Sequence, residues 1–252
     1  MTLAAREPGL AEVMDGPCDE ARLFATYRHF ALANRVVSGW RRVYVGRVRP
    51  LLAARSAAVP ARLLDIGFGG GDIPRALAAW ADADGLRLDV TAVDPDERAL
   101  RFARGVDRGG RVRYRAASAR ELLAAGERFD VVVSNHVLHH LGEAERGALL
   151  ADSAGFGARL IVHDDIERSR LAYAAWAVGA LPFAADSFAH VDGLRSIRRS
   201  YAARELAALA PGWRVERMFP WRLLLVRATH SGDDPVGRRV SRAERAVLAR
   251  DL

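Results

Sequence analysis

Residues 63–74, LLDIGFGGGDIP, join an apolar run to four glycines within five residues and place an acidic residue on each side of them. The apolar run is typical of a buried strand, and apolar residues at helical spacing follow from Asp72 onward. Glycines between a strand and a helix can adopt positive φ angles and let the backbone approach a ligand closely. The stretch therefore predicts a ligand-binding turn of an α/β sheet.

The spacing of these glycines differs from that of two common nucleotide-binding loops. A dinucleotide-binding turn has the pattern G-x-G-x-x-G, whereas the register from Gly67 places Asp72 at the third glycine position, and no Gly-Lys-Ser/Thr follows as in a P-loop. Acids in the loop oppose a pyrophosphate and favour a cation. Asp94 ends the next predicted strand, where an acid can accept hydrogen bonds from the hydroxyls of a ribose. We expect a partly cationic ligand that carries a ribose.

Predicted strands and helices alternate through the centre of the chain. The expected strands are residues 61–66, 86–93, 111–116, 129–134 and 158–163, and the expected helices are residues 72–83, 95–104, 118–125 and 143–154. This alternation predicts a Rossmann-like, doubly wound α/β sheet, mostly parallel and covered on both faces. Residues 213–219 and 221–228 are separated only by Pro220, so we expect a C-terminal antiparallel hairpin.

The length of 252 residues suits one domain with additions. We expect an N-terminal helical leader or cap over residues 1–60, a core domain over residues 61–229 and a charged tail over residues 230–252. A helical lid insertion is expected at about residues 168–201. An insertion there lies over the carboxyl ends of the strands, where open α/β sheets bind ligands.

The net charge of +7 and a pI of about 10.5 would indicate nucleic acid or an anionic membrane if the basic residues clustered. All 38 are arginines spread along the chain, densest at Arg195, Arg198 and Arg199. The single cysteine, Cys18, excludes an internal disulfide and a multi-cysteine metal centre. The longest uncharged run, residues 171–185, is shorter than the roughly 20 residues of a membrane span, and no secretory leader opens the chain. We predict a cytoplasmic protein without stable membrane insertion, as a monomer or a homodimer.

Three motifs in order, LLDIGFGGG, VTAVDPDE and FDVVVSNHVLHHL, resemble the successive motifs of class I S-adenosylmethionine-dependent methyltransferases. The resemblance covers residues 61–228, including the terminal hairpin. Within that family the chain is most similar to small-molecule enzymes of the ubiquinone and menaquinone methyltransferase type. The upstream segment HFALANRVVSGWRR resembles their leader helix, which closes over the cofactor. The resemblance implies S-adenosyl-L-methionine as cofactor and a small aromatic or lipophilic molecule as acceptor.

The resemblance also implies roles for individual residues. Asp65 would lie near the ammonium group of the cofactor, and Asp94 would bind the ribose hydroxyls. Ser118 stands where the family often has an acid that contacts the adenine amino group, so its hydrogen bond would be weaker. The remaining predicted cofactor-binding residues border the methionine part, the adenine or the transferable methyl group, and are Gly67, Phe68, Gly69, Gly71, Pro95, Asn135 and His136.

The chemistry of methyl transfer needs alignment more than activation. The methyl on a sulfonium is already electrophilic, and alignment of the reacting atoms can supply about 7–11 kcal/mol of the barrier. A phenol, with an ordinary pKa of about 10, is helped by a general base, for which histidine is the usual residue. The predicted catalytic residues are His136, His163 and His139, whereas His140 is assigned to packing.

Asp164 and Asp165 suggest a bound magnesium ion as an alternative to metal-free catalysis. They end one predicted strand, and Asn135 ends the neighbouring one, so their oxygen atoms could lie close together. Magnesium requires about six oxygen ligands. Related metal-dependent catechol enzymes have a carboxylate at the end of the fourth strand, where this chain has only Ser134 and Asn135. We therefore expect no metal.

The lid segment, residues 171–190, is rich in small and aromatic residues. It predicts either a plain buried helix or an apolar roof over an aromatic or prenylated acceptor, with Arg195, Arg198 or Arg199 for an acidic or ketonic substituent. The predicted function is O- or C-methylation of a phenolic, quinone or polyketide-like compound, as in secondary metabolism.

Two alternatives stay open. A nucleic-acid (RNA) methyltransferase fits the charge, although the fourth-strand motif reads S-N-H-V rather than N-P-P-Y or D-P-P-Y. A protein that binds S-adenosylmethionine without catalysis is the other.

Overall fold

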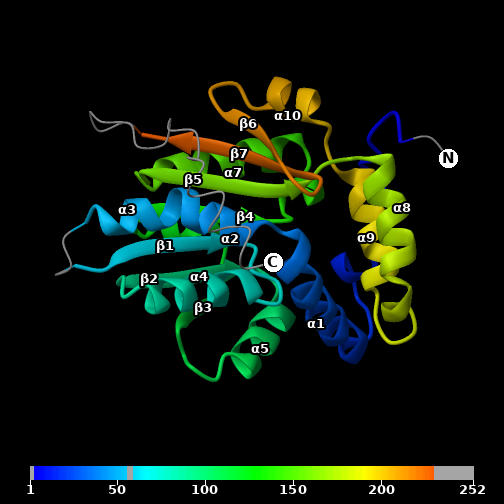
Figure 1. The fold of residues 1–252 in the computed structure, drawn as a ribbon, viewed down its shortest axis with the longest axis horizontal. Helices are drawn as coiled ribbons and strands as arrows, with labels where there is room; N and C mark the ends of the chain where they lie inside the picture. Colours follow the sequence, from blue (N-terminus) through cyan, green and yellow to red (C-terminus); the bar gives the residue numbers. More distant parts are fainter. Residues whose placement is uncertain (1–2, 56–58, 230–252) are drawn as a thin grey trace.

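The computed structural model describes residues 3–55 and 59–229. Within these ranges the chain forms a seven-stranded sheet with the order β3-β2-β1-β4-β5-β7-β6 (Figure 1). The strands are β1 (Ala61–Ile66), β2 (Leu88–Asp94), β3 (Val112–Ala116), β4 (Val131–Asn135), β5 (Leu160–Ile166), β6 (Arg214–Met218) and β7 (Arg222–Ala228). The tail predicted at residues 230–252 lies outside the described residues.

The predicted Rossmann-like sheet is confirmed. β7 pairs antiparallel with both β5 and β6, and the pairs among β1 to β5 are all parallel. β1 has the predicted bounds, but β5 continues to Ile166 instead of stopping at His163. The polar pair Asp164 and Asp165 interrupts the apolar pattern that predicted the strand, yet both residues pair with β7 in the sheet.

Helices cover both faces of the sheet. They are α1 (Glu20–Val37), α2 (Trp40–Val43), α3 (Arg49–Ala53), α4 (Asp72–Ala83), α5 (Glu97–Val106), α6 (Ala119–Ala124), α7 (Glu143–Gly155), α8 (Arg170–Gly179), α9 (Ala189–Arg199) and α10 (Ala203–Leu209). α1 to α5 pack on one face and α6, α7 and α10 on the other, each with its own apolar core. None of the helices in the described ranges is long and apolar enough to cross a membrane.

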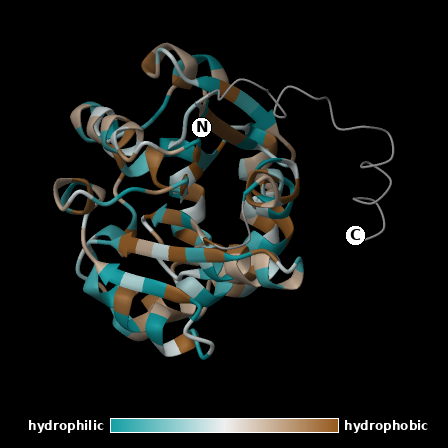
Figure 2. Cartoon of the chain, turned by 90° about the vertical axis from the view of Figure 1, so that its left-hand side faces the viewer, coloured by the Kyte–Doolittle hydropathy of each residue, from teal (hydrophilic) through white to brown (hydrophobic). Residues whose placement is uncertain are grey.

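Alternating side chains of the strands supply both cores. Leu63 and Val133 face the core that contains α4, whereas Leu64 and Val132 face the core that contains α7. Because side chains alternate along a strand, a strand that is buried on both faces must be almost continuously apolar. Hydrophobic segments accordingly recur along the strands in Figure 2.

The order of the strands creates the site. After β1 the chain proceeds outward through β2 and β3, then returns to place β4 on the other side of β1. The loops that follow β1 and β4 therefore diverge, which is where open α/β sheets bind ligands. α1, α8 and α9 stand beyond the carboxyl ends of the parallel strands in Figure 1 and cover this crevice.

Candidate active site

A cavity of about 740 Å³ lies at the carboxyl ends of the strands. One part of its wall is polar and contains the glycine loop after β1, Asp72 and Asp94. Another part is mainly apolar and comes from α1, α8, α9 and the turn η4 (Leu181–Phe183), with Phe30, Trp176 and Phe183 among its side chains. The volume falls within the range of small-molecule sites, about 300–1,000 Å³.

Two glycines of the loop combine a positive φ angle with no space for a Cβ. Gly67 and Gly71 have φ angles of 74° and 69°, in the left-handed region that favours glycine. A Cβ on Gly67 would lie 2.6 Å from the side chain of Val137, and one on Gly71 would lie 2.8 Å from the hydroxyl of Tyr114. Gly67 borders the cavity, whereas Gly71 caps α4 and supports the loop from outside it.

Asp94 joins the end of β2 to the glycine loop. Its Oδ2 accepts a hydrogen bond from the backbone N–H of Gly69 at 2.9 Å, and its Oδ1 accepts one from the backbone N–H of Asp96 at 2.9 Å. Burial raises the pKa of Asp94 despite these bonds. Each carboxylate oxygen can accept a second hydrogen bond, so both can serve a ligand in the cavity.

Asp65 is a buried acid that has no counter-ion within the part of the chain that the structure describes. The residue is 1% exposed, and its Oδ1 has no hydrogen-bond partner among the described residues. Burial, followed by the nearby acids Asp72 and Asp94, raises the pKa of Asp65 well above its ordinary value. Asp65 precedes the glycine loop and does not itself line the cavity. Asp72 and Asp94 line the cavity close to Asp65, and this group of acids makes the region of the glycine loop favourable for a cation.

Arg222, the first residue of β7, organises the polar centre of the site. It is 2% exposed, and its Nε donates to Asp164 Oδ1 at 2.9 Å. Its Nη2 donates to Asn135 Oδ1 at 2.9 Å, and its Nη1 lies 2.6 Å from His136 Nε2. The same Asn135 oxygen accepts from the indole N–H of Trp40 at 3.0 Å, which brings the N-terminal helices to the end of β4.

Sequence reasoning missed both Arg222 and Trp40. A charged residue at the start of the apolar strand RLLLV is a signal that could have revealed Arg222. Trp40 belongs to the leader motif HFALANRVVSGWRR, but nothing in that motif indicates that its indole reaches the end of β4.

His136 is a neutral histidine with an unusual backbone. Its φ of 59° lies in the left-handed region, which is uncommon for a residue other than glycine. Burial and the neighbouring Arg222 lower its pKa well below the ordinary value. Because a guanidinium can only donate, Nε2 of His136 is the acceptor and Nδ1 carries the proton.

His139 has the opposite charge preference. Its backbone N–H and its Nδ1 donate to Asp165 at 2.8 and 2.7 Å. Burial alone would lower the pKa of His139, but Asp165 and Glu12 raise it to about 9, and His139 in turn lowers the pKa of Asp165. Asp165 is thus bonded to His139 and Asp164 to Arg222, so the two carboxylates considered for magnesium already have partners.

His163 and Ser118 lie away from the cavity. His163 is fully buried, its Nδ1 lies 2.8 Å from Ser134 Oγ, and burial lowers its pKa to about 3. Ser118 caps α6 in a reciprocal hydrogen bond with Glu121. Among the predicted site residues, those that line the cavity are Gly67, Phe68, Gly69, Asp94, Pro95, Asn135, His136 and His139, and those that do not are Asp65, Gly71, Ser118 and His163.

The arginines of α9 bind the N-terminal segment. Nε of Arg198 donates to Glu7 at 2.9 Å, and Nη1 of Arg199 donates to Asp15 at 2.6 Å. Arg195 donates to the backbone carbonyl of Ala11. These contacts do not support the prediction that the three arginines bind an acidic or ketonic substituent of the acceptor, because each of them already donates a hydrogen bond to residues 7–15.

Trp176 forms the centre of the apolar roof. Its Nε1 donates to the carbonyl of Ala189 at 3.2 Å, and α8 approaches α9 so closely that a Cβ on Gly193 would lie 2.2 Å from that nitrogen. The roof thus depends on a glycine in α9.

Residues 63–155 match the profile of a family described as a methyltransferase domain. A ubiquinone biosynthesis O-methyltransferase of Sinorhizobium medicae (strain WSM419) is 38% identical over 86 residues, which are 33% of this chain and 32% of that protein. A protein of the same name from Methylobacterium sp. (strain 4-46) is 33% identical over 120 residues, 47% of this chain and 46% of that protein. The match covers less than half the length of either relative.

Solved structures share the fold. The plantazolicin methyltransferase BpumL, in complex with a pentazolic desmethylPZN analog and SAH, has a TM-score of 0.53 with 13% sequence identity over 78% of each chain. The plantazolicin methyltransferase BamL, in complex with a triazolic desmethylPZN analog and SAH, also has a TM-score of 0.53, with 14% identity over 78% of this chain and 75% of that one. At this identity the likeness concerns the fold alone.

Proposed function

Because the chain belongs to the class I S-adenosylmethionine-dependent methyltransferases, we propose that it transfers a methyl group from S-adenosyl-L-methionine to a small aromatic or lipophilic acceptor. The observation that carries this proposal is that one cavity is lined both by the glycine loop with its acids and by aromatic side chains of the covering helices. Asn135 and His136, which follow each other where β4 ends, line the same cavity. A charged, ribose-bearing cofactor suits the glycine loop with its acids, and an aromatic acceptor suits the aromatic side chains.

The residues present fit this cofactor. Asp94 has lone pairs available for the two ribose hydroxyls, and the backbone of Gly67 and Gly69 borders the space for the methionine part. The unpartnered Oδ1 of Asp65 is the strongest sign, because a buried carboxylate without a cation is costly. When bound, the cofactor supplies a methyl group activated by its sulfonium.

His136 is the proposed proton acceptor for a phenolic hydroxyl. It lines the cavity and is neutral, whereas His139 is protonated at neutral pH and His163 lies outside the cavity. Nε2 of His136 accepts from Arg222, so the acceptor hydroxyl must replace that hydrogen bond before the proton can transfer. Asn135, fixed by two donors on its oxygen, keeps its amide N–H groups for orientation of the reactants.

The proposed acceptor is a phenolic, quinone or polyketide-like compound. The roof of Phe30, Trp176 and Phe183 offers aromatic and apolar contact, and the relatives are named for O-methylation in ubiquinone biosynthesis. These observations favour oxygen as the first atom to test and carbon as the second. Against a nucleic-acid substrate, the densest arginine patch of the sequence is bonded to the protein's own N-terminal segment.

The proposal includes a role for the two helical segments that are predicted to lie outside the core domain. Residues 1–60 and the insertion at about 168–201 are proposed to cover the core domain and to exclude water from the site. Trp40 supports the first part of this proposal, because its indole reaches Asn135. Trp176 supports the second, because it borders the same cavity from α8.

Transfer of a labelled methyl group from the cofactor to a panel of phenols and quinones tests the function, with RNA as a separate arm. We expect product from at least one aromatic compound and none from RNA. Binding of S-adenosylhomocysteine by calorimetry without transfer to any panel member would leave the non-catalytic alternative. His136→Ala should lose turnover toward a phenol and keep the cofactor affinity, and normal turnover would instead indicate catalysis by alignment alone.

A further inference from the structure

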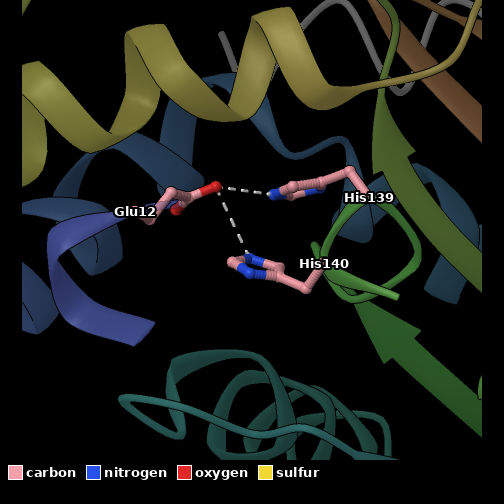
Figure 3. A group of neighbouring side chains, drawn as sticks. All are labelled: Glu12, His139 and His140. Atoms are coloured by element: carbon pink, nitrogen blue, oxygen red, sulfur yellow. Dashed lines mark ion pairs between the residues drawn. The ribbon is translucent and has the colours of Figure 1, made fainter. Parts of the chain in front are cut away.

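Glu12, His139 and His140 form a cluster in the wall of the cavity (Figure 3). Both histidines belong to the turn η3 (Leu138–His140) after β4, and Glu12 immediately precedes the turn η1 (Val13–Asp15) near the N-terminus. Oε1 of Glu12 lies 3.3 Å from Nε2 of His139 and 3.8 Å from Nε2 of His140. Side chains distant in the sequence thus point at one position.

A carboxylate holds the second ring nitrogen of each histidine. Nδ1 of His139 donates to Asp165 Oδ1 at 2.7 Å, and Nδ1 of His140 lies 3.0 Å from Asp15 Oδ1. Both rings therefore direct Nε2 toward Glu12. Histidines that bind metals almost always have this second partner, which fixes the tautomer and the orientation of the ring.

Nε2 of His139 is a buried nitrogen that faces Oε1 of Glu12 at 3.3 Å and has no well-aligned hydrogen bond among the described residues. The side chain is 1% exposed, and Glu12 beside it is 2% exposed. An ion with bonds of about 2.0–2.2 Å in a tetrahedral arrangement separates its ligand atoms by roughly 3.3 Å. The 3.3 Å between His139 and Glu12 already has this value, and small rotations would bring His140 to it.

The charges around the cluster also suit a cation. Three carboxylates belong to it or support it, from Glu12, Asp15 and Asp165. Arg199 approaches Glu12 to 3.7 Å, beyond hydrogen-bond range, and the same Nη1 donates to Asp15 at 2.6 Å. Arg199 thus faces two of these carboxylates, Glu12 and Asp15, while Arg6 and Arg222 place positive charge near Asp165. A divalent ion that displaces the proton of His139 would add one positive charge beside the carboxylate of Glu12.

We propose that Glu12, His139 and His140 bind one divalent transition-metal ion, of which Zn²⁺ fits the ligand set best. Because a metal ligand must be deprotonated, the ion would take the place of the proton on Nε2 of His139. Two imidazoles and one carboxylate are a common zinc ligand set in which a fourth position stays open. All three residues line the cavity, so the open position faces the space for the acceptor. An oxygen of a phenol or quinone would be the fourth ligand, a role that rests on the proposed function. This site differs from the magnesium site considered on Asp164 and Asp165.

Metal binding by the full-length chain tests the proposal. Protein stripped with a chelator is dialysed to equilibrium against Zn²⁺, and Co²⁺ is added in parallel as a visible-absorption probe of the ligand geometry. We expect one ion per chain and a tetrahedral Co²⁺ spectrum. Glu12→Gln and His140→Ala should each weaken Zn²⁺ binding at least tenfold. Glu7→Gln and His190→Ala, which remove the same kinds of group outside the cluster, should bind as the wild type does.

Each outcome decides between a metal site and a set of ion pairs. Zn²⁺ binding that is absent in the wild type, or unchanged in both cluster variants, would overturn the proposal. Thermal melting shows whether each variant folds, and His140, 27% exposed, provides the test if Glu12→Gln does not. Binding of S-adenosylhomocysteine is measured by calorimetry on the same protein samples. A chain that binds Zn²⁺ but not this compound would refute the proposed function and leave the metal site intact.

Discussion

Replacement of Asp65 by asparagine should change stability and cofactor affinity in opposite directions. The substitution keeps the shape of the side chain and removes its charge. The folded-state pKa of Asp65 is raised, so its contribution to stability is greatest at low pH and is lost as the pH rises through the folded-state value. At neutral pH the wild type therefore carries a cost that an uncharged asparagine does not.

The structure supplies the magnitudes. A buried polar atom without a partner costs about 1–3 kcal/mol, and more when it is charged. Removal of the charge from the unpartnered Oδ1 should raise the free energy of unfolding by about 1 kcal/mol, or roughly 2–4 °C in Tm for a chain of this size. A hydrogen bond to a charged group is worth about 1.5–3 kcal/mol, so the loss of the ammonium partner should raise the Kd of S-adenosylmethionine about 10- to 150-fold.

Differential scanning calorimetry of the ligand-free protein and titration calorimetry with the cofactor measure the two effects. The gain in Tm should shrink as the pH falls toward 4, because both proteins then lack the charge. Asp89→Asn, which alters an exposed acid on the neighbouring strand β2, should change neither quantity. A lower Tm together with an unchanged Kd would refute the reasoning, since Asp65 would then be a structural residue.

Three other substitutions probe the site. Asp94→Ala removes the acceptor of the Gly69 N–H and should weaken cofactor binding at least tenfold, about 1.4 kcal/mol, while the fold persists; equal affinity in calorimetry would exclude the ribose assignment. Gly193→Ala must displace Trp176 from the apolar roof and should raise the KM for the acceptor but not the KM for the cofactor. Gly147 has open space around its Cα, so Gly147→Ala is the control and should change neither KM. Burial lowers the pKa of His163 to about 3, so between pH 3 and 6.5 the unfolded chain binds one more proton than the folded chain. The free energy of unfolding of the wild type should therefore rise with pH in this range, by up to about 1.4 kcal/mol per pH unit more than that of His163→Asn. Equal slopes of the two proteins in denaturant titrations would contradict the lowered pKa.

Local sequence patterns predicted the sheet because its central strands, β1, β4 and β5, are mostly apolar and buried on both faces. β1 and α4 have the predicted bounds, since their apolar runs end at glycines. β5 was predicted too short, because the pairing of its last residues with β7 is a contact between distant segments that no local pattern contains.

The candidate site could be predicted only in part. Residues that follow strand ends, such as Asp94 and Asn135, reach the cavity because parallel strands end at one edge of the sheet. The residues that bond to them come from distant parts of the sequence, as Arg222 and Trp40 do for Asn135, so a local motif does not predict these contacts. His136 and His139 look alike in the sequence, yet burial and Arg222 lower the pKa of the first, whereas Asp165 and Glu12 raise the pKa of the second.

β7 is the last strand in the sequence, yet it lies inside the sheet between β5 and β6. Arg222 at its start joins Asp164 and Asn135, which come from two strands made much earlier in the chain. The polar centre of the site therefore needs the chain up to β7, and a truncation before Arg222 would remove the guanidinium that joins the ends of β4 and β5.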